Sequence, residues 1–294
     1  YLAQQAGGLS DQMFKDGPYQ SNRSRNWFEV DWLLYNIKYK KEFSEKTNFT
    51  FSFFGLEAKR NSLGFRTNRV SQVDSGQERD LIKGDFSNFG FESRLLSRYK
   101  AFKNKSYFLL GLKYYNSNSS SIQGPGSNGS DANFNFQNSL YPNYNNQSDY
   151  TYPNKNIALF GENIFYLTEN FSITPGFRYE NIETKSDGFY RKINLDGAGN
   201  VIFNEKYDEL DVKKRNFLLL GLGISYKPNR NIEMYSNISE NYRSVTFADI
   251  SIINPAYAVN PDIDDEKGYT FDLGFRGNIN RKISYDTNIF LLLY

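Results

Sequence analysis

The sequence feature that most constrains the fold is an alternating stretch at residues 170–180, NFSITPGFRYE. Its odd-numbered residues, from Phe171 to Tyr179, are apolar, and the even-numbered residues among them are polar or glycine. Successive side chains of a β-strand point to opposite faces, so this spacing predicts a strand with one apolar face and one polar face. Soluble β-sandwiches contain such strands too, so the stretch alone does not decide the architecture.

The pattern recurs along the chain, in about ten segments separated alternately by short and long connections. The predicted strands are residues 27–40, 48–59, 86–99, 107–116, 157–167, 170–180, 212–226, 232–243, 268–278 and 283–294. The short turns fall near Ser44, Lys103, Thr168, Lys227 and Asn280, and the long connections are residues 60–85, 116–156, 185–211 and 244–267. This rhythm is typical of an all-β, antiparallel up-and-down transmembrane β-barrel, and it predicts tight turns at one rim and long loops at the other.

Three local features refine this prediction. Phe28, Val30, Trp32 and Leu34 share one face of the first strand, but the following apolar residues share the other, which predicts a β-bulge near Leu33. Residues 196–200 (DGAGN) predict the turn of a small hairpin that stands above the membrane. Residues 1–25 are loop-like in composition.

Composition excludes several classes of function. No stretch offers the roughly 20 consecutive apolar residues of a transmembrane helix, whereas a barrel strand needs only every second residue to be apolar. The formal charge of +2 gives no reason to expect a nucleic-acid partner. Cysteine and histidine are absent, which removes thiol catalysis, histidine acid–base chemistry and the usual transition-metal ligands. We therefore expect no enzyme activity, no resident metal and no cofactor.

The alternation also predicts which side chains meet lipid and which meet water. The apolar, lipid-facing set is Phe89, Phe91, Leu110, Leu112, Phe177, Leu220, Leu222, Leu273 and Phe275. The polar set is Glu92, Arg94, Arg98, Arg178, Glu180, Asp272 and Arg276. Charged residues two apart on one face suit the wall of a water-filled lumen, where we expect them to form ion pairs.

Several runs resemble the barrel of the TonB-dependent outer-membrane receptors. They are residues 157–168 (IALFGENIFYLT) followed by 170–180, then 234–250 (MYSNISENYRSVTFADI) and 260–277 (NPDIDDEKGYTFDLGFRG). Residues 3–14 (AQQAGGLSDQMF), 64–74 (GFRTNRVSQVD) and 79–99 (RDLIKGDFSNFGFESRLLSRY) resemble, more narrowly, the ferric-dicitrate receptors of that family.

The resemblance implies a barrel of about 22 strands, the size class of the plugged outer-membrane transporters, with an N-terminal plug domain and a TonB box. Neither of these is in the sequence, so residues 1–294 are interpreted as one partial barrel domain, truncated at both ends. The implied location is the outer membrane of a Gram-negative bacterium. The implied partners are a ferric chelate, the TonB complex acting through the N-terminal region outside this sequence, and outer-membrane lipid and lipopolysaccharide.

Arginines of the second long connection are the candidate ligand-binding residues. An anionic ferric chelate calls for cations with forked donors, and this segment carries Arg60, Arg66, Arg69 and Arg79. The alternative is that these arginines meet lipopolysaccharide phosphates or solvent. The acidic residues Asp262, Asp264, Asp265 and Glu266 do not have the spacing of an EF-hand, so they are interpreted as a solvated loop.

The leading hypothesis is a receptor that binds a ferric chelate, with ferric citrate first, and releases it inward when the plug is pulled. The same barrel could carry another siderophore, cobalamin or an oligosaccharide. From other classes, a barrel enzyme would need a nucleophile with a base, and none stands out in the sequence. A soluble adhesin-like β protein would have shorter strands without alternating short and long connections.

Overall fold

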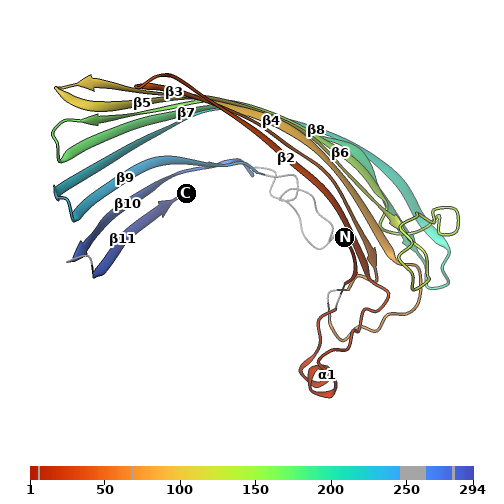
Figure 1. Ribbon diagram of the computed structural model, residues 1–294. Helices are drawn as coiled ribbons and strands as arrows, with labels where there is room; N and C mark the ends of the chain where they lie inside the picture. The colour runs from red at the N-terminus through yellow and green to blue at the C-terminus, as the bar shows by residue number, and fades with distance from the viewer. Residues whose placement is uncertain (6, 68, 246–262, 280–281) are drawn as a thin grey trace.

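The computed structural model describes residues 1–294 except residues 6, 68, 246–262 and 280–281. The described residues form one curved, open sheet of 11 strands in chain order, each antiparallel to its neighbour (Figure 1). The strands are β1 (Leu2–Gln4), β2 (Trp27–Ser44), β3 (Thr47–Gly64), β4 (Asp80–Ala101), β5 (Asn104–Pro125), β6 (Ser148–Tyr166), β7 (Phe171–Leu195), β8 (Val201–Asn229), β9 (Ile232–Arg243), β10 (Glu266–Ile279) and β11 (Ile283–Leu293). The predicted all-β, up-and-down architecture is confirmed, and β2 to β11 are the ten predicted strands.

One helix, α1 (Asp11–Asp16), lies in the described part of the chain, before β2. The Ser10 side chain caps it by accepting a hydrogen bond from the backbone N–H of Met13. The loop-like interpretation of residues 1–25 is therefore wrong at α1 and at β1, which pairs with the start of β2. A serine followed by Asp11, with Gly17 after the last helical residue, was the available sequence signal. Among the described residues, no helix is both long and apolar enough to cross a membrane.

The strand register fixes which side chains share a face. Phe91 lies opposite Phe53 on β3 and Tyr114 on β5, and its ring stacks on that of Tyr114 at 5.4 Å between centroids. Phe177 lies opposite Leu220, and Leu222 opposite Ile238. Followed from strand to strand, this register places all nine predicted lipid-facing residues on one face, which we call the apolar face. The seven predicted lumen residues share the opposite, polar face.

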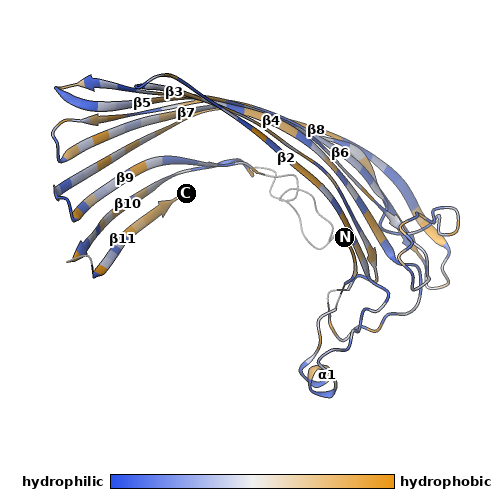
Figure 2. Ribbon diagram, viewed as in Figure 1, coloured by the Kyte–Doolittle hydropathy of each residue, from blue (hydrophilic) through white to orange (hydrophobic). Residues whose placement is uncertain are grey.

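The apolar face is not covered by a second layer of protein. Leu220 and Leu273 are both 52% exposed, although they lie in the middle of their strands. In Figure 2 hydrophobic and hydrophilic residues alternate along the strands, and β11 is hydrophobic along most of its length. A soluble sandwich buries such a face against a second sheet. A bare apolar face on a sheet of this size is instead what a membrane β-barrel presents to lipid.

The connections separate into two ends as predicted. Tight turns join β2 to β3, β4 to β5, β6 to β7 and β8 to β9, and β10 pairs with β11 towards the same end. The β3–β4, β5–β6 and β7–β8 connections lie at the opposite end (Figure 1). Asp74 lies in the β3–β4 connection and Lys227 near the β8–β9 turn, so they are at opposite ends. Phe102 and Lys103, at the β4–β5 turn, both have positive φ, which gives that turn the twist that suits a tight hairpin. The predicted turn at Asn280 lies outside the described residues.

The strands are longer than the sequence predicted at the end with the long connections. β3 continues to Gly64, β5 continues to Pro125, and β6 begins at Ser148. β7 and β8 stay paired up to a tip at residues 196–200, so the predicted hairpin turn is confirmed but the hairpin is a continuation of two barrel strands. Beyond the apolar band both faces are polar, so the alternation disappears although the backbone pairing persists.

The predicted bulge near Leu33 is wrong. The register between β2 and β3 runs unbroken from Trp27–Leu63 to Glu42–Asn48, and it shifts only between Glu42 and Ser44. The apolar side chains change face without any change of register. Trp32 and Leu34 lie on the polar face, and Tyr35 and the apolar residues after it lie on the apolar face. The pattern changes because the lipid-facing band covers only the part of β2 nearest the tight turns.

Candidate functional site

Three segments meet at the end of the sheet with the long connections: residues 1–26, the β3–β4 loop (residues 65–79) and the β5–β6 loop (residues 126–147). Direct hydrogen bonds hold them together. Trp27 Nε1 donates to the carbonyl of Ser130 at 2.8 Å, and Arg25 Nη1 to the carbonyl of Asn128 at 2.7 Å. The mouth of the sheet is therefore one connected assembly of loops.

Arg79 lies at the centre of this assembly and is fully buried. Its guanidinium donates to the carbonyls of Ser127 (2.9 Å), Arg25 (2.9 Å) and Asp131 (2.7 Å), and to the Ser127 hydroxyl at 2.6 Å. Burial and the neighbouring Arg25 charge lower the pKa of the Arg79 guanidinium below its ordinary value. The sequence placed this side chain in an exposed loop, where it could meet a ligand. In the structure it links loop backbones instead, because carbonyls of residues 1–26 and of the β5–β6 loop converge on it.

Arg25, which the sequence analysis did not single out, forms a two-pronged ion pair with Asp74. Nε lies 2.8 Å from Oδ2, and Nη2 lies 2.5 Å from Oδ1. The hydrogen bond from Arg25, with a further one from the backbone N–H of Gly76, lowers the pKa of Asp74 although burial opposes this. The pair ties residues 1–26 to the β3–β4 loop. No spacing in the sequence signals it, because its partners are 49 residues apart.

Arg23, Arg66 and Arg69 line a cavity of about 320 Å³, which we call the arginine pocket. Its other lining residues are neutral: Gln5, Gly7, Gly8, Asn26, Ser62, Gly64, Phe65, Thr67 and Val70. Gly7 is required at this wall, because a Cβ there would lie 2.1 Å from Oδ1 of Asn22. The pocket is thus a concave site with three cations and no carboxylate among its lining residues.

The three arginines differ in how free their guanidinium groups are. Arg23 is 5% exposed, lies 5.4 Å above the Phe65 ring and donates to backbone carbonyls, including that of Arg69 at 3.3 Å. Arg66 is exposed and reaches a carboxylate oxygen of Asp80 at 3.3 Å. Arg69 is exposed, and in the described part of the chain no acceptor binds its guanidinium. The pocket therefore combines one fixed cation with two that can turn towards a ligand.

Arg60 is not in the loop, as the sequence had predicted, but on the extended part of β3. Its guanidinium lies 5.5 Å from the centre of the Phe86 ring. It precedes Ser62, which lines the arginine pocket, by two residues and shares its face of the strand. Of the four predicted ligand-binding arginines, the structure thus brings Arg66 and Arg69 together, leaves Arg60 just below them and buries Arg79. Arg23 is the pocket arginine that the sequence analysis missed.

Asp80 connects the pocket to the neighbouring loops. This carboxylate is 5% exposed and accepts hydrogen bonds from Gln123 Nε2 at 2.8 Å and Tyr144 Oη at 2.9 Å, as well as from Arg66. Burial and the Asp80 charge raise the pKa of Tyr144, so its hydroxyl stays protonated and keeps donating. The position of Arg66 is therefore coupled to the β5–β6 loop through one buried carboxylate.

The predicted lumen residues form ion pairs on the polar face. Arg94 pairs with Glu92 at 2.6 Å, and Arg178 with Glu180 at 2.5 Å. Arg276 pairs with Glu233 on β9 at 2.8 Å. The two remaining members have other contacts: Asp272 accepts a hydrogen bond from Asn237, and the Arg98 guanidinium lies 6.0 Å from the centre of the Tyr107 ring.

The acidic run that leads into β10 is only partly a solvated segment. Asp265 accepts hydrogen bonds from Arg215 Nε at 2.8 Å, the backbone N–H of Val245 at 2.9 Å and the Tyr242 hydroxyl. Burial opposes ionisation, but these donors still lower the pKa of Asp265. The solvated interpretation is therefore wrong for Asp265, while Asp262 lies outside the described residues.

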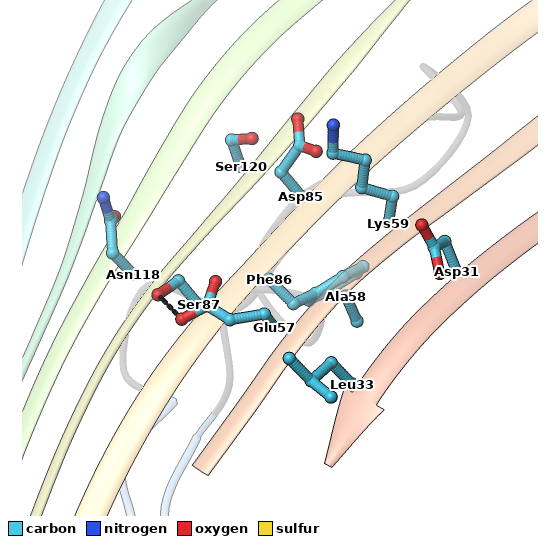
Figure 3. Close-up of a pocket in the computed structure, with 10 residues that line it drawn as sticks. All are labelled: Asp31, Leu33, Glu57, Ala58, Lys59, Asp85, Phe86, Ser87, Asn118 and Ser120. Carbon is cyan, nitrogen blue, oxygen red and sulfur yellow. Dashed lines mark hydrogen bonds between the residues drawn. The ribbon is translucent and has the colours of Figure 1, made fainter. Parts of the chain in front are cut away.

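A second depression, of about 330 Å³, lies on the extension of the apolar face above its hydrophobic part (Figure 3). It is lined by Asp31, Leu33, Glu57, Ala58, Lys59, Asp85, Phe86, Ser87, Asn118 and Ser120. The Ser87 hydroxyl donates to Glu57 at 2.7 Å. Among the described residues, no cluster of three or more acidic, histidine or cysteine side chains could hold a metal ion. We assign no ligand to this depression and interpret it as the polar zone above the lipid-facing band.

An antiparallel meander with one bare apolar face, one polar face and elaborated loops at a single end defines a segment of the wall of a membrane β-barrel. The family model described as "TonB dependent receptor-like, beta-barrel" matches residues 3–291, and the chain belongs to this family. Comparison with proteins of curated function found no match.

Solved structures show the same fold. The ferric citrate transporter FecA in its unliganded form is similar, with a TM-score of 0.70 and 17% identity over 99% of this chain and 38% of that one. The ferric-catecholate import receptor Fiu from E. coli K12 has a TM-score of 0.65 and 12% identity, over 90% and 41% of the two chains. The copper transporter OprC has a TM-score of 0.64 and 14% identity, over 90% and 39%. The chain thus spans under half the length of the structures that it matches.

Proposed function

We propose that this chain forms part of an outer-membrane receptor that takes up a ferric chelate, with ferric citrate as the favoured ligand. The observation that carries the proposal is the arginine pocket at the loop end of the polar face. Membership of the TonB-dependent receptor family supports the transport role. The similarity to the fold of a ferric citrate transporter, together with the sequence runs quoted above, favours citrate over other chelates.

The chemistry of the pocket suits a polycarboxylate. Arginine binds carboxylates through two parallel N–H donors and stays charged at any physiological pH. The lining residues include no carboxylate, and of the three pocket arginines only Arg66 has a carboxylate partner, Asp80, among the described residues. Iron that arrives already chelated needs no protein ligand, which fits a sequence without histidine or cysteine.

The remaining parts of the proposal concern partners. The apolar face contacts outer-membrane lipid, and the polar zone above it meets lipopolysaccharide. Energy for uptake comes from the TonB complex, acting on a plug domain that residues 1–294 do not contain. The chain itself performs no catalysis.

The proposal is tested on the whole receptor by titration with ferric citrate. Replacing Arg66 or Arg69 by alanine removes one charge-assisted contact each, and we expect affinity to fall about ten- to a hundredfold per contact. Arg230→Ala, an exposed arginine at the tight-turn end, is the matched control and should bind like wild type. A neutral chelate should distinguish loss of charge matching from general loop damage, because its binding should change much less.

Wild-type affinity for ferric citrate in both Arg66→Ala and Arg69→Ala would refute the proposal. A wild-type receptor that binds a different siderophore, cobalamin or an oligosaccharide in place of ferric citrate would keep the transport role and replace the ligand.

A further inference from the structure

The polar face carries an uneven distribution of charge. On the part of β2 to β6 nearest the tight turns, it presents the cations Lys38, Lys40, Arg94, Arg98, Lys100, Lys105 and Lys113 and the carboxylates Glu42, Glu92 and Glu162. On the corresponding part of β7 to β11, again nearest the tight turns, the same face presents the cations Arg178, Lys227 and Arg276 and the carboxylates Glu180, Glu233, Asp272 and Asp286. The wall is therefore positive on one side and slightly negative on the other.

The two sides also differ in pairing. Near the tight turns of β7 to β11, each of the three cations named above has a carboxylate partner within 4 Å, as in Arg276–Glu233. On β2 to β5 only Arg94 has one. The four lysines Lys38, Lys40, Lys100 and Lys105, which we call the lysine cluster, are exposed and have no hydrogen bond or ion pair in the part of the chain that the structure describes. Ion pairing within the wall thus accounts for the charged residues on β7 to β11. It does not account for the lysines on β2, β4 and β5.

The arrangement within the cluster is unfavourable for the sheet itself. Lys100 and Lys105 are directly opposed partners on β4 and β5, and Lys38 and Lys40 follow each other on one face of β2. Like charges directly opposite each other on a sheet destabilise it. Opposed lysines therefore cost the sheet stability. This cost is expected where a bound anion balances the charges of the lysines.

The lysine cluster and the arginine pocket lie at opposite ends of the same face. From Lys100 to Asp80, which contacts the pocket arginine Arg66, β4 runs about 65 Å at the usual rise per residue. The residue types also differ: the pocket uses arginine, and the cluster uses lysine. Lysine is a strongly hydrated point charge that holds a carboxylate without the two-pronged geometry of arginine. A conducting pathway needs sites that attract its cargo and still release it.

We infer that the lysine cluster is a second, weaker binding station for the anionic ferric chelate, where the chelate is held briefly before it leaves the lumen at the tight-turn end. The inference rests on the proposed function, since it takes the same class of ligand, a polycarboxylate chelate of iron. The pocket captures the chelate, and the cluster lowers the barrier to its exit.

The test separates uptake from binding. In the whole receptor, the variant Lys38→Gln/Lys40→Gln/Lys100→Gln/Lys105→Gln keeps chain length and polarity and removes four charges. We expect equilibrium binding of ferric citrate at the pocket to stay at the wild-type level. We expect TonB-dependent uptake of radiolabelled ferric citrate by cells to fall about tenfold at equal receptor abundance, roughly the loss of two exposed charge contacts.

The matched control replaces four lysines on the opposite face, Lys41→Gln/Lys59→Gln/Lys155→Gln/Lys185→Gln, and should take up ferric citrate like wild type. Removing like charges should leave the thermal stability of the cluster variant equal or higher. If that variant is absent from the membrane, the two pairs are neutralised separately, because they lie on different hairpins.

Four results would overturn the inference. If the wild-type receptor binds and takes up ferric citrate and the cluster variant takes it up equally well, the inference is refuted while the proposed function stands. A parallel loss of binding would place the lysines in the capture site, and a lowered thermal stability would assign them to contacts with acidic groups of the plug. A wild-type receptor that does not bind ferric citrate would refute the proposed function first, and the inference with it.

Discussion

Replacing Arg79 by alanine tests whether one buried side chain holds the loops at the mouth of the sheet together. The substitution deletes four hydrogen bonds and leaves the carbonyls of Arg25 and Asp131 without their donor, whereas the carbonyl of Ser127 keeps only the backbone N–H of residue 79. A net hydrogen bond from a charged donor is worth about 1.5–3 kcal/mol, and water will replace part of what is lost. We therefore expect the free energy of opening these loops to fall by about 3–5 kcal/mol, the range for breaking a buried charged contact.

Hydrogen exchange measures this change directly. The backbone N–H of Gly126 donates to the carbonyl of Arg79 at 2.6 Å, so its exchange reports separation of the β3–β4 and β5–β6 loops. The expected change corresponds to exchange about a hundred- to several-thousandfold faster in Arg79→Ala. Arg79→Lys keeps the charge without the forked donors, so exchange at Gly126 in this variant should be faster than in wild type and slower than in Arg79→Ala.

The control is Arg60→Ala, which removes one exposed cation–π contact with Phe86 and should change exchange at Gly126 less than about tenfold. Exchange at Gly126 in Arg79→Ala that cannot be distinguished from that of wild type would refute the reasoning. It would mean that backbone pairing, and not the arginine, keeps the loops closed.

Two further predictions concern the membrane face and pH. Leu220→Arg should reduce the stability of the protein in lipid, measured by denaturant titration, by about 2–4 kcal/mol. Its neighbour Leu219→Arg, on the polar face, should cost much less, and equal costs would contradict the assignment of faces. Because the pKa of Asp74 is lowered in the folded chain, its bond to Arg25 stabilises the β3–β4 loop above the ordinary value of 3.8 and is lost as the pH falls through the lowered pKa. The protection of the β3–β4 loop against hydrogen exchange, taken relative to the intrinsic exchange rate at each pH, should fall in that acid range. In Asp74→Asn this protection should be low and should not change with pH there.

The faces of the strands could be predicted from the sequence because a period of two is a local property. Phe177 and Leu220 lie on opposed strands, and each was placed correctly from its own neighbours. The strand ends were not predictable in this way. Above the lipid-facing band, polar residues such as Lys59 and Asp85 occupy the face that is apolar further along the same strands, so no alternation remains to mark a strand.

The candidate site was only half predictable for a related reason. Arg66 and Arg69 were found because they are close in sequence and lie in one loop. Arg23 reaches the same pocket from a segment more than forty residues away, and the burial of Arg79 depends on carbonyls supplied by two other segments. Charge and spacing say nothing about such long-range convergence. The apparent bulge at Leu33 was a different kind of error, in which a change of surroundings along β2 looked like a change of register.

The length of the β7–β8 hairpin has a practical consequence. The apolar face of β7 ends at Tyr179, and the strand continues to Leu195, which is about 50 Å of further strand. The rings of Tyr190 and Tyr207 stack at 5.3 Å across this extension. At the tip, the space around Gly197 and Gly199 is open. A foreign peptide spliced into this tip would stand clear of the apolar band and of the neighbouring strands, so the hairpin is the natural place to insert an epitope without disturbing the sheet.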